Sequence, residues 1–220
     1  MSHETIYRSL FVQAKGALKH ELTGYLRTGR VMRRPRGGNK FGSKTMGQLR
    51  DVISIRERPA EAEDRAVPGH WEGDLICGKA GSAVATLVER STRFALLIRI
   101  ERIHSEVVAR ALREHILTLP QQLRRSLTCD QGKEMARHLQ FTIDTGVAVY
   151  FCDPKSPWQR GTNENTNGLI RQYLPKRTDL RPHSQAQLDA IAAALNGRPR
   201  KTLHFMTPSQ KLAEAVASTT

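Results

Sequence analysis

Residues 156–173 read SPWQRGTNENTNGLIRQY, and the interpretation of the whole chain starts from this stretch. Pro157 and Gly161 interrupt regular structure, whereas the apolar residues that follow recur at helical spacing, so the stretch predicts a loop that runs into a helix. Glu164 then lies in the first helical turn. A carboxylate there is either an ordinary helix-start residue favoured by the helix dipole or one ligand of a metal site.

Two aspartates at strand ends support the metal-site interpretation. Asp74 lies on a predicted strand, residues 70–76, and Asp130 ends another, residues 126–130. If these strands are neighbours, both carboxylates emerge at one place on the sheet, and the helix that carries Glu164 returns over it. Three carboxylates without a balancing cation repel one another at neutral pH, and oxygen ligands of this kind select Mg²⁺ or Mn²⁺.

The charge of the chain favours phosphate chemistry at such a site. Two divalent ions ~4 Å apart can activate an attacking oxygen and stabilise the leaving oxygen during displacement at phosphorus. A glycosidase-type pair of carboxylates is the other acid–base alternative. The formal net charge of +14 argues against a neutral sugar substrate and for a polyanionic partner such as nucleic acid.

The remaining pattern predicts an α/β fold. Further strands are expected over residues 83–89, 94–100 and 147–152, and helices over 105–119 and 133–141. After the helix of Glu164, capping boxes predict one helix from Ser184 and a short final helix from Thr207. The order of elements indicates a mixed five-stranded sheet flanked by helices, with helical N- and C-terminal extensions.

Charge and composition divide the chain into three parts. Basic residues outnumber acidic ones by 14 to 7 over residues 1–70, by 11 to 9 over 71–150, and by 10 to 5 over 151–220. We expect a helical segment over 1–27, a basic flexible linker over 28–66 and a catalytic core with C-terminal helices over 67–220. The linker segment is too polar to fold alone and offers phosphate contacts, although a solvated run of charge is the alternative.

Cysteine usage and hydropathy indicate a soluble intracellular protein. The three cysteines are odd in number, far apart and without a Cys-x-x-Cys motif, which is typical of reduced thiols. No apolar run approaches the ~20 residues that span a bilayer, and the N-terminus lacks the apolar segment of a signal peptide.

Several spaced motifs resemble one known family. The segments HWEGDLI (70–76), DQGKE (130–134), DPKSPWQRGTNEN (153–165), NGRPRK (196–201) and TP (207–208) are similar to those of bacterial transposases of the insertion sequence thirty family. That family shares the ribonuclease H-like fold with retroviral integrases. The resemblance covers essentially the whole chain.

The resemblance implies a DNA-cleaving and strand-transferring enzyme. It implies the catalytic triad Asp74, Asp130 and Glu164, two Mg²⁺ (or Mn²⁺) ions, and DNA as partner at both the element ends and the target. It also implies a cytoplasmic, nucleoid-associated bacterial protein, with a homo-oligomer expected in the transposition complex and no membrane partner. Members generally carry an upstream helix-turn-helix region, so we expect an N-terminally truncated member. An inactive fragment that only binds DNA or inhibits transposition is the alternative.

Other polar residues are weaker candidates. Glu72 shares a strand face with Asp74, and Glu134 lies about one helical turn beyond Asp130, so each either supports the metal site or is an ordinary polar residue. Trp158 either packs or stacks on a base. Phosphate contacts are expected from a set of basic residues in the linker, around the Glu164 helix and in the tail: Arg33, Arg34, Arg36, Lys155, Arg160, Arg171, Arg198, Arg200 and Lys201.

Overall fold

The computed structural model describes residues 49, 51–154 and 156–217 of the chain. The chain divides into two compact units, residues 1–44 and 45–220, and every described residue belongs to the second. The expected helical segment 1–27 and the linker arginines Arg33, Arg34 and Arg36 lie outside the described residues, as does Lys155.

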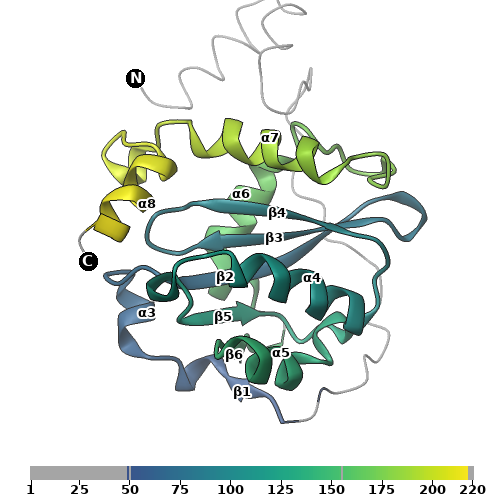
Figure 1. Cartoon of the computed structure of the whole chain (residues 1–220), viewed down its shortest axis with the longest axis horizontal. Coiled ribbons are helices and arrows are strands. Elements are labelled where there is room, and N and C mark those ends of the chain that lie inside the picture. The colour runs from purple at the N-terminus through teal and green to yellow at the C-terminus, as the bar shows by residue number, and fades with distance from the viewer. Residues whose placement is uncertain (1–48, 50, 155, 218–220) are drawn as a thin grey trace, which may run out of the picture. The chain divides into compact units, whose positions relative to one another are not determined.

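A six-stranded mixed sheet forms the centre of the second unit (Figure 1), in the order β1-β6-β5-β2-β3-β4. The strands are β1 (Ile53–Ser54), β2 (His70–Cys77), β3 (Ala83–Glu89), β4 (Ala95–Ile100), β5 (Ser126–Cys129) and β6 (Ala148–Phe151). β2, β3 and β4 form the expected antiparallel meander, whereas β1, β6, β5 and β2 run parallel. The α/β class and the mixed sheet are confirmed, with one strand more than the five expected.

The additional strand comes from the segment expected to be a linker. Residues 53–64 form β1, the 3₁₀ helix η2 (Ile55–Glu57) and α3 (Ala60–Asp64). Arg58 and Ala62 are buried there. His138 Nε2 lies 3.2 Å from the carbonyl oxygen of Asp51, which ties this segment to the core. Folded structure therefore begins before residue 67.

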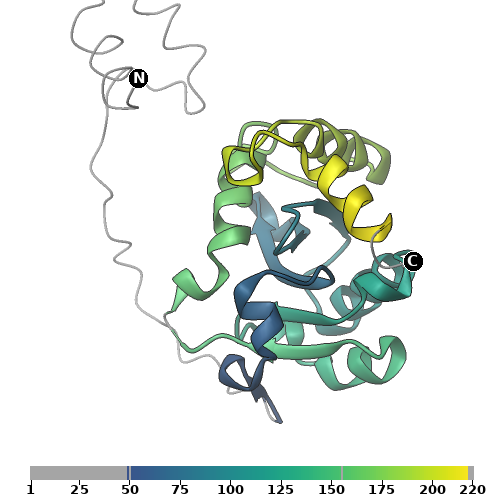
Figure 2. The same ribbon diagram turned by 90° about the vertical axis from the view of Figure 1, so that its left-hand side faces the viewer.

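Helices cover both faces of the sheet. α4 (Ser105–Leu117) and α5 (His138–Thr145) lie on one face, and α6 (Gly161–Ile170) and α7 (Gln185–Asn196) on the other (Figure 2). Strand alternation explains the two layers: Ala85 and Leu87 of β3 join the core under α4, whereas Val84 joins the core under α6 and α7. Short 3₁₀ helices form most remaining turns: η3 (Lys79–Gly81), η4 (Gln121–Leu123), η5 (Lys133–Met135), η6 (Pro157–Arg160) and η7 (Lys201–Leu203).

Helix ends follow the capping pattern of the sequence. Ser184 and Gln187 form a reciprocal capping box at α7. Thr207 and Gln210 do the same at α8 (Pro208–Ala217), with bonds of 2.9 and 3.1 Å. The expected helix 133–141 differs, because the short 3₁₀ helix η5 and the separate α-helix α5 replace it. None of the helices in the described ranges is long and apolar enough to span a bilayer.

Candidate active site

Asp74 and Asp130 lie at the same level of two neighbouring parallel strands. β2 and β5 pair from His70 opposite Ser126 to Glu72 opposite Thr128. Continuing that register places Asp130, directly after β5, opposite Asp74. The sequence prediction that these strands are adjacent is thus confirmed.

Gly73 allows β2 and β5 to approach closely at this level. A Cβ atom at residue 73 would lie 3.0 Å from Cys129 Sγ and 3.1 Å from Leu127 Cδ1, tighter than ordinary side-chain contacts. The glycine in the HWEGDLI motif therefore keeps the two aspartates at a distance set by backbone packing.

Arg160 bridges the two aspartates. Its Nη1 lies 3.2 Å from Asp74 Oδ1, and its Nη2 lies 3.1 Å from Asp130 Oδ2. Nη1 also donates to the carbonyl oxygen of Gly73 at 3.1 Å. The Arg160 side chain is 9% exposed, compared with 25% for Asp74 and 48% for Asp130, so the cation lies beneath both carboxylates. Burial alone would lower the pKa of Arg160, but Asp130 and Asp74 outweigh burial and raise it.

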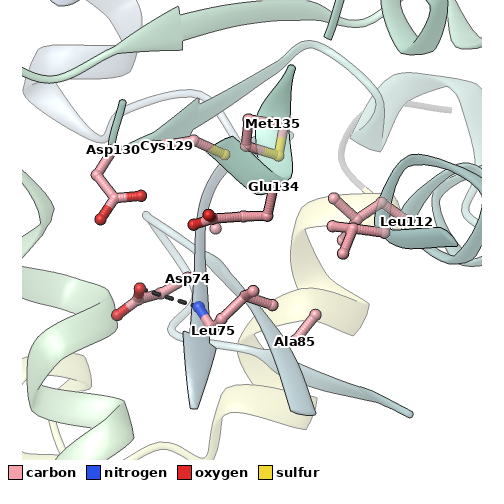
Figure 3. A pocket seen from close by; sticks show the side chains of 10 residues that line it. Asp74, Leu75, Ala85, Leu112, Cys129, Asp130, Glu134 and Met135 are labelled. Atoms are coloured by element: carbon pink, nitrogen blue, oxygen red, sulfur yellow. Dashed lines mark hydrogen bonds between the residues drawn. The ribbon is translucent and has the colours of Figure 1, made fainter. Parts of the chain in front are cut away.

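A third carboxyl group shares this place. Asp74, Asp130 and Glu134 line a small pocket against α4, and Figure 3 shows their carboxyl groups turned toward a common space. Gly132 leaves room for Glu134, because a Cβ at residue 132 would overlap the Glu134 carboxyl group. Burial raises the pKa of Glu134, and the charges of Asp130 and Asp74 raise it further against the effect of its own backbone N–H. Burial also raises the pKa of Asp130, as does Asp74, while Arg160 lowers it.

α6 lies across β2 and orients Asp74. Asn167 Nδ2 donates to Asp74 Oδ2 at 2.9 Å, and the Leu75 amide donates to Asp74 Oδ1 at 2.9 Å. One turn earlier, the Asn163 amide donates to Glu72 Oε2 at 2.8 Å, and Asn163 Nδ2 donates to the Glu72 carbonyl oxygen at 2.7 Å. Asn163 and Asn167, four residues apart on α6, thus bind Glu72 and Asp74, two residues apart on β2. The sequence analysis did not select Asn163 or Asn167 as site residues, although both flank Glu164 in the segment NENTN (163–167).

Glu164 lies on this helix but is exposed. Among residues 49, 51–154 and 156–217, no group of three or more His, Cys, Asp and Glu side chains is close enough to hold a metal ion. Neither Glu164 nor Glu134 is therefore close enough to both Asp74 and Asp130 to complete a three-ligand metal cluster in this part of the structure. Glu164 lies three residues before Asn167, the α6 residue that binds Asp74.

Glu72 points to the same sheet face as Asp74, but its carboxylate is fully buried. Its hydrogen bonds anchor α6 to the sheet. Oε1 accepts a 2.6 Å bond from Arg90 Nη1, and Oε2 accepts the bond from the Asn163 amide. Asn163 Oδ1 in turn accepts from Thr86 Oγ1 at 3.0 Å. Glu72 thus fixes the start of α6 on the sheet. The sequence predicts that Glu72 and Asp74 share a strand face, because they are two residues apart on one strand. It does not predict that Arg90 pairs with Glu72.

The basic candidates in the described residues are spread over the C-terminal half. Arg171 donates to the Cys77 carbonyl oxygen at 3.2 Å, and burial lowers its pKa. Arg198 donates to Tyr173 Oη and to Gln172 Oε1, the latter at 3.0 Å. Arg200 donates to the Leu195 carbonyl oxygen at 3.2 Å, and Lys201 is exposed.

The chemistry of the donor set fits a hard divalent cation. The pocket is lined mostly by apolar side chains, and its charged groups are the carboxyl groups of Asp74, Asp130 and Glu134. Oxygen donors of this kind suit Mg²⁺ or Mn²⁺ better than zinc. Burial is the largest cause that raises the pKa of Asp130 and Glu134, and the negative charge of Asp74 adds to it, while Arg160 acts in the opposite direction.

Comparison with known proteins agrees with this architecture. Residues 64–157 match the family model "Integrase core domain". The chain is 51% identical over its full length to "Transposase for insertion sequence element IS1086" of Cupriavidus metallidurans, and 48% identical to "Transposase InsI for insertion sequence element IS30A" of Escherichia coli. It spans 64% and 57% of those two proteins.

A solved structure supports the fold. The catalytic core domain of BIV integrase superposes with a TM-score of 0.53 at 16% identity, over 69% of this chain and 97% of that one. The six-stranded mixed sheet with helices on both faces is therefore the ribonuclease H-like fold of retroviral integrase cores. The transposase relatives are matched along the whole chain, so these findings show that the chain is similar to the integrase-type catalytic core of IS30-type transposases.

Proposed function

We propose that this chain is the catalytic core of a DNA transposase that cleaves DNA strands and transfers them to a target by metal-dependent phosphoryl transfer. The observation that carries the proposal is the placement of Asp74 and Asp130 at one level of adjacent parallel strands, beneath the helix that bears Glu164. The transposase names of the relatives, which the chain matches in part of their length, support the same reaction.

Asp74, Asp130 and Glu164 would hold the ions, proposed to be two Mg²⁺ or Mn²⁺. When bound, such ions activate the attacking oxygen and stabilise the leaving oxygen of an in-line displacement. Asn167 fixes the orientation of the Asp74 carboxylate, and the Leu75 amide holds its other oxygen. Glu134, whose carboxyl group shares the pocket, supports the site from the α4 side.

Substitution of the three acids tests this assignment. Asp74→Asn, Asp130→Asn and Glu164→Gln each remove a charged ligand and almost no volume, so each should abolish Mg²⁺-dependent cleavage of DNA bearing the correct ends. General DNA binding should stay nearly intact. Asp153→Asn is a matched control, because Asp153 is a half-buried acid bound to Gln159, outside the pocket. Strand transfer by the triple variant would refute the assignment.

DNA contact is proposed to depend mainly on phosphates. The linker arginines, the tail residues Arg198, Arg200 and Lys201, and the arginines beside α6 supply positive charge, and Trp158, 73% exposed in η6, offers a stacking surface. Log affinity should fall against log salt by about 0.9 per phosphate neutralised. Replacing Arg33, Arg34 and Arg36 with Ala should flatten that slope equally for an element-end duplex and a scrambled one. A preference above about a hundredfold for the element end would instead require several base contacts.

The oligomeric transposition complex and the nucleoid location remain parts of this proposal. The alternative of an inactive, DNA-binding or inhibitory fragment predicts no cleavage by the unaltered chain under any metal condition. The substitution experiment on Asp74, Asp130 and Glu164 tests this alternative as well, because it measures cleavage by the unaltered chain as its reference.

A further inference from the structure

The place between the two aspartates already contains a cation. Arg160 forms an ion pair with Asp74 Oδ1 at 3.2 Å and donates a hydrogen bond to Asp130 Oδ2 at 3.1 Å. The guanidinium is held from behind by the Gly73 carbonyl oxygen at 3.1 Å. Its buried Nε makes no hydrogen bond within the described residues. This nitrogen is therefore a buried donor that the bridging position leaves unsatisfied.

We propose that Arg160 is the internal counter-cation of the two aspartates, that it competes with divalent metal for them, and that it thereby sets the metal affinity of the site. The inference rests on the proposed assignment of Asp74 and Asp130 as metal ligands. It concerns the arginine itself, which neither the family match nor the names of the relatives assign.

Competition follows from the limited number of free oxygen atoms. Asp74 Oδ2 accepts from Asn167, and Asp74 Oδ1 accepts from the Leu75 amide and forms an ion pair with Arg160. A cation that binds Asp74 and Asp130 together lies close to the guanidinium, which already contacts one oxygen of each carboxylate. A guanidinium keeps its charge at all accessible pH values, so its repulsion of a divalent ion can be relieved only by movement of the side chain.

The position of Arg160 in the chain permits that movement. It ends η6, directly before α6, whereas the helix behind it is anchored separately through Asn163 and Glu72. The side chain can therefore leave the aspartates without displacing the helix. A displaced guanidinium at the mouth of the site is suited to a phosphate oxygen of DNA, because arginine binds phosphate through paired N–H groups.

The test measures Mn²⁺ binding by titration calorimetry on the full chain, without DNA. Arg160→Met keeps the length of the side chain and removes its charge. This variant should bind Mn²⁺ about tenfold more tightly than the unaltered chain, which corresponds to about 1.4 kcal/mol. Its melting temperature in chelator should be lower, and saturating Mn²⁺ should raise that temperature more than it raises that of the unaltered chain.

Two further variants separate the causes. Arg198→Met removes one positive charge at an exposed site beside Tyr173 and should leave Mn²⁺ affinity unchanged. If Arg160→Met does not fold in chelator, Arg160→Lys gives the same comparison: it loses the two-pronged contact and should bind Mn²⁺ more tightly than the unaltered chain, by less than tenfold. Equal or weaker binding in both Arg160 variants overturns the inference.

Failure of the metal site itself gives a different result. Asp74→Asn should lose most Mn²⁺ binding. If Asp74→Asn binds Mn²⁺ as the unaltered chain does, the ions are held elsewhere and the proposed function fails with the inference. If Asp74→Asn loses binding but Arg160→Met gains none, only the role of Arg160 is refuted.

Discussion

Substitution of Glu72 by Gln should strongly destabilise the fold. The Glu72 carboxylate is fully buried and bonded to Arg90 at 2.6 Å and to the Asn163 amide at 2.8 Å. Glutamine keeps the shape but leaves the buried Arg90 without its counter-charge. Removing one partner of a buried ion pair costs about 3–5 kcal/mol, a large part of the ~5–15 kcal/mol by which a domain is stable.

A double-mutant cycle measured by urea unfolding isolates this pair. Arg90→Met alone should also destabilise, because it leaves the Glu72 carboxylate buried without a cation. The double variant Glu72→Gln/Arg90→Met should be more stable than the sum of the single effects by about 0.5–3 kcal/mol, the range found for residues in contact. Arg113→Met is the exposed control, since Arg113 pairs with Asp144 near the surface. Additive effects within about 0.5 kcal/mol would refute the proposed anchor.

Two other predictions concern the packing and the charge of the same region. Gly73→Ala places a Cβ atom 3.0 Å from Cys129 Sγ and should lower the free energy of urea unfolding by about 1–3 kcal/mol. The control Gly168→Ala lies inside α6, where the added Cβ meets nothing within 4 Å, and should raise that free energy by about 0.5–1 kcal/mol. Equal effects of the two variants would contradict the close contact between β2 and β5. Burial raises the pKa of Asp130 and Glu134, so their ionisation favours the unfolded chain. The measurement compares the stability of the unaltered chain with that of an Asp130→Asn/Glu134→Gln variant in chelator as a function of pH. The relative stability of the unaltered chain should be greatest below the unfolded pKa values, which are about 4, fall as pH rises through the raised folded values, and then level off. A relative gain in stability with rising pH would show that the fold stabilises the charged forms instead.

The sequence predicts the sheet centre well because its signals there are local or topological. Nearly continuous apolar runs identify β3 and β4, and capping pairs identify the starts of α7 and α8. The order of elements allows β2 and β5 to be neighbours, and their pairing in the structure brings Asp74 and Asp130 together.

Other features depend on contacts that no local pattern reports. β1 has two residues, and only its pairing with β6 makes it a strand, so its polar surroundings predict a linker. Glu134 reaches the pocket because a 3₁₀ turn, rather than one continuous helix, follows Asp130. Arg160 was expected among the phosphate contacts, since sequence gives its charge and not the carboxylates that surround it.

α6 connects the stability of the fold to the geometry of the site. Its first turn is bound to the buried Glu72, one turn later Asn167 holds Asp74, and Arg160 just before it bridges the aspartates. A shift of the helix along β2 therefore changes the anchor, the orientation of Asp74 and the position of Arg160 together. Because packed interfaces tend to have discrete arrangements rather than continuous ones, the anchored helix leaves the Arg160 and Glu164 side chains as the movable groups. Exchange of the guanidinium for metal can then proceed by rotation of side chains over a fixed backbone.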